Sequence, residues 1–376
     1  MPEFPYSRLR RWPDVEADNL QAYDATDLLL VERALALDAP GSETVVIGDE
    51  YGAITLALTA AGRRGIRVHQ DLATGRRALS RNAEVLGLAG FTAHELDAEL
   101  LAGAKVVLLQ LPKALAELEE ITDAVVRWAA PDVVLIAGGR VKHMTLTQNE
   151  VLGRRFAQVQ AQRAERKSRL IVASEPLPAP STPPFPVSAQ HDGLTLVAHG
   201  GAFAGARLDI GTRVLLEALG AQATGAAVDV LDLGCGTGAL AVSYALAHPE
   251  ARVTATDRSA AAVASARATA AVNGVADRVV VTLDDAASDV PDASVDVVLL
   301  NPPFHLGASV HTGAATRLFE AAARVLRPGG ELFTVYNSSL AYRPELTRLI
   351  GATTQVTRTA KFTVTRSIRR SDTPDS

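Results

Sequence analysis

Residues 228–240, with the sequence VDVLDLGCGTGAL, decide the fold of the second half of this chain. The first six residues form an apolar, β-branched run typical of a buried strand, and a loop with three glycines follows at once. Residues 239–247 then have the composition of a helix. A glycine loop between a strand and a helix brings backbone N–H groups to the helix N-terminus, where a ligand can approach closely. The stretch therefore predicts an α/β domain with a ligand site at this loop.

Three details of the sequence favour S-adenosylmethionine over a dinucleotide as that ligand. The glycines are spaced Gly-x-Gly-x-Gly, whereas the dinucleotide fingerprint is Gly-x-Gly-x-x-Gly. Asp232 stands just before the loop, where it would repel a pyrophosphate but attract a cationic ammonium or sulfonium group. Asp257 follows the next predicted strand, residues 252–256, where it can accept hydrogen bonds from two ribose hydroxyls. A glycine-rich turn without a ligand is the alternative.

The adenine end of such a site is expected after the third strand of the domain, residues 279–283. Asp284 and Asp285 stand at the end of that run, where a carboxylate can accept a hydrogen bond from an adenine amino group. We favour Asp285 for this contact, although either acid could equally be a solvated turn residue. Cys235 is expected to fill a small space rather than to react. The full set of candidate cofactor residues is Asp232, Gly234, Cys235, Gly236, Gly238, Asp257, Arg258, Asp285, Ala286 and Asn301.

A stiff tetrapeptide follows the next apolar run, residues 295–300. It consists of Asn301, Pro302, Pro303 and Phe304. Ligands of open α/β sheets bind beyond the carboxyl ends of the strands, so these residues should face the cofactor loop. The Asn301 side-chain oxygen and the Pro302 carbonyl can accept both hydrogens of an exocyclic amine and hold it in line with a methyl group. Phe304 offers a face on which an extruded base can stack. We therefore expect these four residues to catalyse amine methylation, and a purely structural turn is the alternative.

The chain carries the same pattern twice. Short Val/Leu/Ile runs alternate with Ala-rich, helix-periodic stretches in both halves, which predicts βαβ units and a mostly parallel sheet in each. An offset of 186 residues places Gly52 on Gly238 and Asp71 on Asp257, and residues 110–113 then fall near the tetrapeptide. Several matches in the same order indicate a duplicated domain.

The two copies differ in chemistry. The first copy has Val46, Glu50 and Lys113 at the positions that correspond to Asp232, Gly236 and Phe304. A glutamate would obstruct a loop whose backbone must approach a ligand closely. We therefore expect the first copy to keep the fold without the site.

Six prolines between residues 176 and 186 separate the copies. Such a run excludes a helix or a central strand, so it predicts an extended linker. The predicted organisation is a degenerate methyltransferase-like domain with an RNA-binding or structural role at 1–174, a Pro-rich linker at 175–190 and a catalytic domain at 191–376.

The composition excludes several classes of protein. No window approaches the roughly 18 uninterrupted apolar residues of a membrane span, and the opening residues lack the pattern of a signal peptide. The single cysteine, Cys235, excludes an internal disulfide and fits a reducing cytoplasm, where we expect the protein. Cysteines and clustered histidines are too few for a zinc site of standard spacing, so no metal is predicted.

The charge gives only local signals for nucleic acid. The net charge of −5 offers no global attraction for phosphates. One basic cluster lies between Arg154 and Arg169, and another between Arg358 and Arg370. Each could bind RNA or equally be a solvated surface.

Four motifs in the second half resemble those of a known family: GAF at 201–203, LDIGTR at 208–213, NPPFH at 301–305 and KFTV at 361–364. The family is the bacterial ribosomal RNA guanine-N2 methyltransferases, in which only the second of two tandem domains is active. The resemblance implies two tandem Rossmann-like class I methyltransferase domains of α/β class, each with a mostly parallel seven-stranded sheet flanked by helices. It also implies that Phe203, Asp209 and Gly211 help to enclose cofactor and substrate, and that the first domain helps to hold RNA.

Other motifs are similar to the large-subunit branch of that family: LRRWP at 9–13, NLQAYD at 19–24, LPK at 111–113 and IAGG at 136–139. The resemblance thus implies methylation of guanine N2 in 23S ribosomal RNA, either naked or within a ribosomal subunit or assembly intermediate. We expect a monomer with no membrane partner. A 16S target is the nearest alternative.

Further alternatives come from other classes. Enzymes that methylate a protein glutamine or a DNA adenine also use an Asn-Pro-Pro turn, although more often with Tyr in the last position. An RNA-binding protein without activity is the non-enzymatic alternative, and the intact Asp232, Gly236, Asp257 and Asn301 argue against it.

Overall fold

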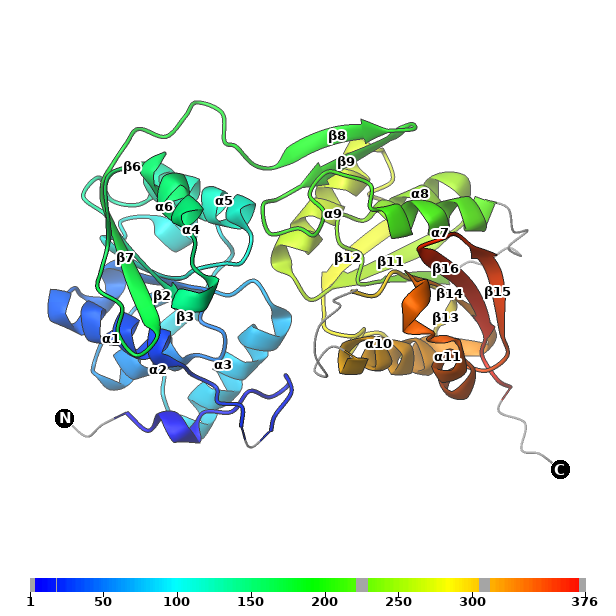
Figure 1. The fold of residues 1–376 in the computed structure, drawn as a ribbon, viewed down its shortest axis with the longest axis horizontal. Coiled ribbons are helices and arrows are strands. Elements are labelled where there is room, and N and C mark those ends of the chain that lie inside the picture. Colours follow the sequence, from blue (N-terminus) through cyan, green and yellow to red (C-terminus); the bar gives the residue numbers. More distant parts are fainter. Residues whose placement is uncertain (1–3, 18, 221–228, 304–311, 372–376) are drawn as a thin grey trace. The chain divides into compact units, whose positions relative to one another are not determined.

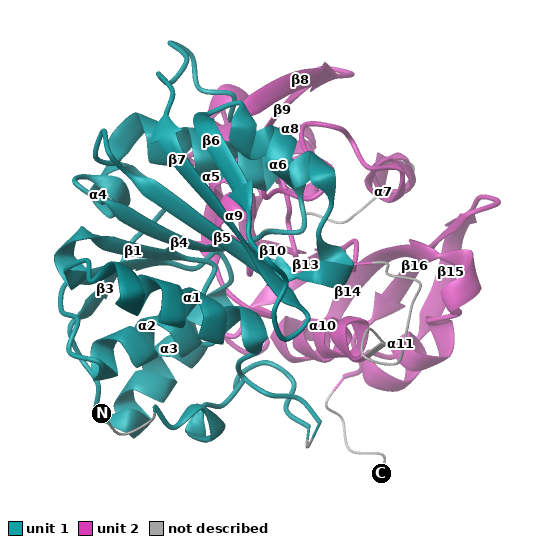
Figure 2. Cartoon of the chain, turned by 60° about the vertical axis from the view of Figure 1, so that its left-hand side comes forward, with its two compact units in different colours: residues 1–185 teal, residues 186–376 magenta. Residues whose placement is uncertain are grey.

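The computed structural model describes residues 4–17, 19–220, 229–303 and 312–371. It divides into two compact units, Met1–Phe185 (unit 1) and Pro186–Ser376 (unit 2), which Figure 2 shows in different colours. Among the described residues, every helix is too short or too polar to span a lipid bilayer.

Unit 1 is built on a seven-stranded sheet with the order β3-β2-β1-β4-β5-β7-β6. Strands β1 to β5 pair in parallel, and β7 is antiparallel to both of its neighbours. The strands are β1 (Thr44–Ile47), β2 (Ile66–His69), β3 (Phe91–Ala93), β4 (Val106–Gln110), β5 (Val134–Arg140), β6 (Phe156–Ala161) and β7 (Ser168–Pro176). The helices are α1 (Ala25–Leu37), α2 (Ala53–Ala60), α3 (Ala73–Leu86), α4 (Ala98–Leu101), α5 (Leu115–Trp128) and α6 (Leu146–Gly153).

Unit 2 repeats this topology in a sheet with the order β12-β11-β10-β13-β14-β16-β15, and a hairpin, β8 (Val187–His191) with β9 (Leu194–Ala198), precedes it. The strands of the sheet are β10 (Asp229–Leu233), β11 (Arg252–Asp257), β12 (Val279–Leu283), β13 (Val295–Leu300), β14 (Leu326–Asn337), β15 (Thr353–Arg358) and β16 (Phe362–Ile368). The helices are α7 (Ile210–Gly220), α8 (Ala239–Ala247), α9 (Ala260–Val272), α10 (Thr312–Val325) and α11 (Arg343–Leu349). The prediction of two tandem α/β domains with mostly parallel seven-stranded sheets is confirmed.

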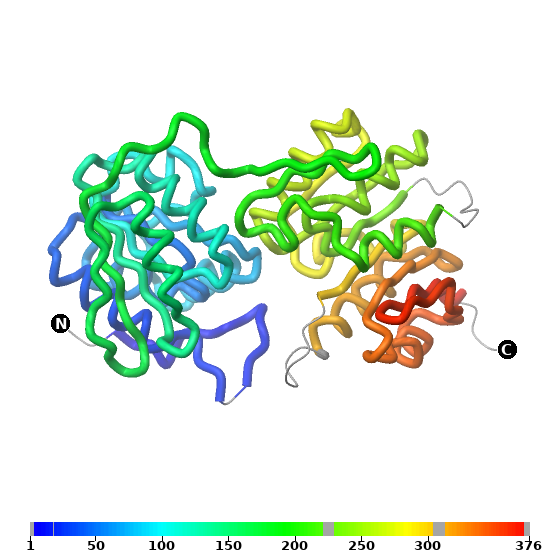
Figure 3. The backbone as a smooth tube through the Cα atoms, turned by 45° about the horizontal axis from the view of Figure 1, so that its top comes forward, coloured from blue at the N-terminus to red at the C-terminus, as the bar shows by residue number. Residues whose placement is uncertain are grey.

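Each sheet is covered on both faces. In unit 2, α7, α8 and α9 pack on one face and α10 and α11 on the other, and in unit 1 α1 to α3 and α4 to α6 divide in the same way (Figure 1). Figure 3 traces the backbone of both units in the order of the sequence. Neighbouring residues of a central strand therefore enter two different cores, as Val230 and Leu231 do in β10. This double burial explains why the parallel strands are continuous apolar runs in the sequence.

Strand register makes the duplication visible at the level of single residues. Ile47 pairs with Leu109 in unit 1, and Leu233 pairs with Leu300 in unit 2. Gln110 therefore occupies the position in unit 1 that Asn301 occupies in unit 2.

The expected linker at 175–190 is shorter in the structure. Strand β7 continues to Pro176, which pairs with Phe156, and β8 begins at Val187. A proline is tolerated at the end of a strand because only its own N–H is missing from the ladder. The extended segment between these strands therefore covers residues 177–186.

Candidate active site

The glycine loop lies at the carboxyl end of β10, and its backbone is tied to β11. The Gly234 and Cys235 N–H groups both donate to the Thr256 carbonyl, at 2.8 and 2.9 Å. Gly234, Gly236 and Gly238 have φ values of 79°, 54° and 78°, in the left-handed region that favours glycine. The loop therefore has the conformation that its sequence predicts.

The three glycines serve two different purposes. A β-carbon at Gly238 would lie 3.0 Å from the Ala266 β-carbon, so this glycine lets α8 and α9 pack closely. A β-carbon at Gly234 or Gly236 would meet no described atom within 4 Å. The first two glycines thus face open space at the carboxyl edge of the sheet, where a ligand can reach the loop backbone.

Asp232 is a buried carboxylate with one bonded oxygen. The Ala241 N–H in the first turn of α8 donates to Oδ2 at 2.9 Å, whereas Oδ1 has no hydrogen-bond partner among the described residues. Burial raises the pKa of Asp232 to about 7, against the Ala241 hydrogen bond, and the nearby charge of Asp257 adds to the rise. A buried oxygen with no donor is costly unless a ligand supplies one.

Asp257 connects the loop to the next helix. Its Oδ2 accepts from the Gly236 N–H and its Oδ1 from the Ser259 N–H, each at 2.9 Å. This carboxylate therefore fixes the glycine loop relative to the start of α9. Arg258, the next residue, is exposed.

The acidic pair after β12 is divided between two roles. The Asp284 carboxylate accepts from the Ser288 hydroxyl and, at 2.9 Å, from the Asp289 N–H, so it organises its own turn. Asp285 is buried and forms an ion pair with Arg317 of α10. Ala286 follows with a φ of 52°.

Cys235 is buried inside the loop. Burial, together with the charges of Asp257 and Asp232, raises the pKa of its thiol well above the ordinary value. A protonated, buried thiol is a poor nucleophile, which agrees with a space-filling role.

The Asn301 side chain is held in one orientation by helix α7. Its Nδ2 donates to the Asp209 carboxylate at 3.1 Å and to the Thr212 hydroxyl at 2.9 Å. A carboxylate can only accept, so the amide nitrogen must face Asp209 and the oxygen must point the other way. This oxygen, Oδ1, is buried and has no hydrogen-bond partner among the described residues. The structure thus presents a preoriented acceptor directly after β13.

The same carboxylate begins α7. Asp209 Oδ2 also accepts from the Gly211 and Thr212 N–H groups, at 2.9 and 3.2 Å, in the manner of a helix N-cap. A β-carbon at Gly211 would lie 3.3 Å from Asn301 Oδ1 and 3.4 Å from a ring carbon of Phe362, so glycine keeps the space beside the oxygen open.

Two segments far apart in the sequence therefore meet at Asn301, and Phe362 lies beside Gly211 in the first of them. Sequence reasoning identified Asp209 and Gly211 by resemblance but missed Thr212, whose hydroxyl completes the pair of acceptors. The sequence does contain a clue to Thr212: it stands three residues after Asp209, and this spacing places both residues at the start of a helix.

The remaining predicted residues differ in their surroundings. Pro302 is buried and Pro303 is exposed, whereas Phe304 and its role as a stacking surface lie outside the described residues. Phe203 is 69% exposed. The two basic clusters are partly neutralised by acids, since Arg154 pairs with Glu119 and Arg366 pairs with Glu331.

In unit 1, other residues of the protein occupy the space beside the corresponding loop. A β-carbon at Gly48, the counterpart of Gly234, would meet the Gln110 backbone oxygen and β-carbon at 3.2 and 3.3 Å. The Arg11 guanidinium lies 4.7 Å from the centre of the Tyr51 ring, and the Tyr51 hydroxyl donates to Asp14 at 2.8 Å. Side chains therefore occupy the surroundings of this loop, unlike those of Gly234 and Gly236.

In the comparisons with known proteins, the two halves of the chain match two different family models. Residues 3–177 match the RLMG N-terminal domain, and residues 193–366 match the methyltransferase small domain. Proteins named ribosomal RNA large subunit methyltransferase G, from Streptomyces coelicolor and Stutzerimonas stutzeri, are each 36% identical to this chain. The first covers 96% of this chain and 97% of its own length, and the second 97% and 98%.

A solved structure shares the fold over both units. It is a T. thermophilus 16S rRNA N2 methyltransferase in complex with AdoMet and guanosine, with a TM-score of 0.74 and 23% identity over 97% of this chain and 99% of its own. This likeness concerns the fold, whereas the full-length sequence relatives show that the chain belongs to the family of the ribosomal RNA large subunit methyltransferase G proteins.

Proposed function

We propose that this protein transfers a methyl group from S-adenosylmethionine to the exocyclic N2 amine of a guanine in 23S ribosomal RNA. The observation that carries the proposal is the Asn301 amide, whose oxygen is buried, preoriented and without a described partner. The names of the full-length relatives support the large ribosomal subunit as the source of the RNA. The chemistry of Asn301 supports an exocyclic amine as the target, and the family resemblance supports N2 of guanine.

The residues around the glycine loop fit the proposed cofactor. Gly234 and Gly236 leave the loop backbone open, and Asp232 has a buried oxygen that lacks a donor. We infer that the loop and Asp257 hold the nucleoside part, and that Asp232 attracts the cationic amino-acid part. The bound cofactor would supply an electrophilic methyl group on a positively charged sulfur.

The task of Asn301 follows from the electronic structure of an aromatic amine. The nitrogen lone pair is delocalised into the ring, so the amine is a poor nucleophile until its two hydrogens are drawn into hydrogen bonds that favour a tetrahedral nitrogen. Asn301 Oδ1 accepts one hydrogen and the Pro302 carbonyl the other, which aims the lone pair at the methyl group. The proton can leave to water after transfer, so the proposal needs no catalytic carboxylate or histidine.

We propose further that unit 1 has lost the cofactor site and serves to hold RNA. Glu50 stands at the position of Gly236, Gly48 faces Gln110, and Arg11 covers Tyr51. A protein that modifies ribosomal RNA works where ribosomes are made, so we place it in the cytoplasm, and we propose that it acts as a monomer.

The test supplies labelled S-adenosylmethionine together with naked 23S RNA, naked 16S RNA, intact ribosomal subunits or a release-factor protein. We expect label in 23S RNA, and digestion to nucleosides should yield N2-methylguanosine by mass spectrometry. Label in protein but not in RNA would refute the proposal. Label in 16S RNA alone would move the target to the small subunit, and N6-methyladenosine would overturn the assignment of the base.

A further inference from the structure

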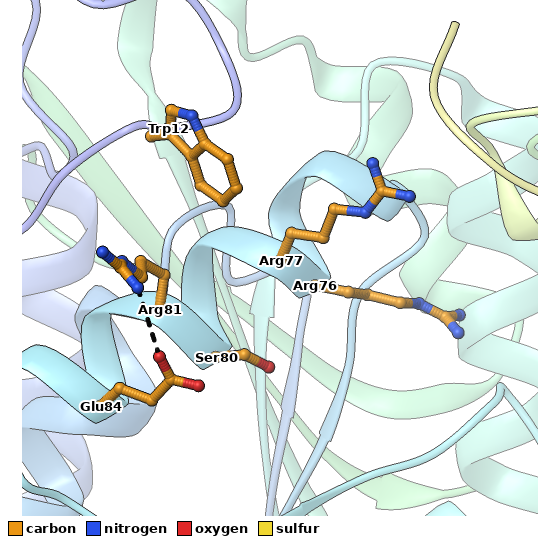
Figure 4. Close-up of a pocket in the computed structure, with 6 residues that line it drawn as sticks. All are labelled: Trp12, Arg76, Arg77, Ser80, Arg81 and Glu84. Atoms are coloured by element: carbon orange, nitrogen blue, oxygen red, sulfur yellow. Dashed lines mark ion pairs between the residues drawn. The ribbon is translucent and has the colours of Figure 1, made fainter. Parts of the chain in front are cut away.

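A tryptophan and three arginines surround a hollow on the surface of unit 1. The hollow has a volume of about 370 Å³ and is lined by Trp12, Arg76, Arg77, Ser80, Arg81 and Glu84. Trp12 comes from the N-terminal segment, and the others belong to helix α3. In Figure 4 the Trp12 ring points toward α3, with Arg81 and Arg77 projecting on either side of it. The proposed methyl transfer makes no use of this region.

Trp12 remains exposed although the backbone around it is firmly held. Leu9 is buried, and the Arg10 N–H and carbonyl both bond to the Asn82 side chain at 2.9 Å. Arg11 donates to the Val15 carbonyl at 2.8 Å and lies over the Tyr51 ring.

The Trp12 side chain is nevertheless 55% exposed. An indole gains free energy when it is buried, and a tightly anchored segment that leaves it in solvent indicates a partner for its face. The LRRWP motif does not contribute to the proposed catalytic site. Its hydrogen bonds to Asn82 hold Trp12 beside α3.

The arginines give the hollow a positive character. Arg77, Arg81 and Glu84 follow one another at helical spacing, so they share one side of α3. The Arg81–Glu84 pair is separated by 3.6 Å, with 63% and 71% of the two side chains exposed. An ion pair this exposed to solvent contributes little to stability. A phosphate can therefore replace the Glu84 carboxylate beside Arg81 at a small cost in free energy. Arg76 forms a closer pair with Glu95, at 2.6 Å, and we assign it to structure.

We propose that an unpaired nucleotide of the RNA substrate stacks on Trp12 while the phosphates beside it bind Arg77 and Arg81. This inference rests on the proposed function, because it assumes an RNA substrate. Aromatic stacking accepts any base, and guanidinium groups bind phosphate oxygens through paired hydrogen bonds. The hollow would therefore bind single-stranded RNA without reading its sequence. The exposed Trp12 ring beside Arg77 and Arg81 favours RNA over an acidic peptide of similar charge, because the peptide offers no base to stack.

Tryptophan fluorescence tests the stacking directly. The chain contains two tryptophans, so Trp128→Phe leaves Trp12 as the reporter. A single-stranded oligonucleotide from 23S RNA should quench this emission, more strongly at low salt, and a duplex of the same sequence should quench it far less. Quenching by a poly-glutamate peptide as strong as that by RNA would assign the hollow to a protein partner and overturn the proposal.

Methylation kinetics separate this inference from the proposed function. We expect Trp12→Ala, and separately Arg77→Gln with Arg81→Gln, to raise the KM for 23S RNA by about 5- to 100-fold. Turnover at saturating RNA and the KM for the cofactor should stay unchanged. Trp12→Phe should retain most of the affinity, and it keeps the test valid if the alanine variant folds poorly. Arg33→Gln, at an exposed arginine of α1, is the control for the loss of one positive charge outside the hollow.

The two possible failures are distinguishable. If the native protein methylates no RNA, the proposed function fails. If it methylates 23S RNA and the Trp12 and arginine variants behave like the Arg33 control, only the present inference fails.

Discussion

Replacement of Asn301 by alanine tests the catalytic geometry most directly. It removes Oδ1, the preoriented acceptor, while the cofactor loop at residues 234–238 keeps all of its own hydrogen bonds. Loss of one prearranged hydrogen-bonding group at a reacting centre typically lowers turnover by about 100- to 1000-fold. Cofactor affinity should change by no more than about twofold, because the deleted atoms follow β13 whereas the glycine loop follows β10.

The variant also loses two hydrogen bonds, and this cost to stability must be kept apart from catalysis. One bond goes to the Asp209 carboxylate and one to the Thr212 hydroxyl, which together contribute about 2 to 4 kcal/mol to the free energy of unfolding. Asn273→Ala is a matched control, because its side chain makes three bonds, two with Thr195 and one with Thr269, away from the site. It should lower stability by a similar amount and leave turnover per folded molecule unchanged.

The assay is single-turnover transfer of labelled methyl to 23S RNA, with cofactor binding measured by calorimetry and folded fraction by thermal unfolding. The expected pattern is a large loss of turnover for Asn301→Ala alone, at equal cofactor occupancy. If Asn301→Ala keeps turnover within about tenfold of the native protein, a margin well inside the loss expected above, the mechanism built on Oδ1 is wrong.

Two further predictions concern the cofactor. Gly236→Ala should weaken cofactor binding at least about tenfold, because its β-carbon enters the open space at the loop; Gly274→Ala shares the positive φ and open surroundings and should bind normally by calorimetry. Cofactor affinity should fall as pH drops below about 7, by up to about tenfold per unit, because Asp232 becomes protonated there and loses the charge that attracts a cation. Above about pH 8, where Asp232 is almost fully ionised, it should level off, and Asp232→Asn should bind weakly with this pH dependence gone.

Much of the fold and the cofactor loop could be predicted because both depend on local sequence. The strand expected at residues 252–256 spans Arg252–Asp257, and the helix expected at 239–247 is α8 with the same bounds. A strand buried on both faces needs an unbroken apolar run, and a loop with left-handed backbone needs glycine, so each leaves a direct trace in the sequence.

The support of Asn301 could not be read in this way. Asp209 and Thr212 lie 92 and 89 residues from it along the chain, and nothing local to either segment specifies the other. Their meeting depends on where α7 packs against the sheet. The sequence predicted that Asn301 would accept a hydrogen bond, but the reason why its oxygen faces the site came only from the fold.

A comparison of the two copies distinguishes a carboxylate that stabilises the fold from one that can also bind a ligand. Sequence alignment placed Val46 on Asp232, which implied that unit 1 lacks the acid. Yet Asp49, three residues later, is buried and accepts from the Ile54 and Thr55 N–H groups at 3.3 and 2.7 Å. Thr55 is the counterpart of Ala241 at the offset of 186 residues, so the first turn of this helix is bound by a buried carboxylate in both units.

In both copies a buried carboxylate accepts a hydrogen bond from an N–H group in the first turn of that helix. This hydrogen bond is therefore part of the fold and does not by itself indicate a cofactor. The copies differ in the second oxygen. In unit 1 both oxygens of Asp49 have donors, whereas in unit 2 Oδ1 of Asp232 has none among the described residues. The carboxylate oxygen without a donor lies in unit 2, the copy in which Gly234 and Gly236 face open space. A buried acceptor that the fold does not require supports the proposal that the cofactor supplies a donor to Asp232 Oδ1, and the paired oxygens of Asp49 support the proposal that unit 1 binds no cofactor.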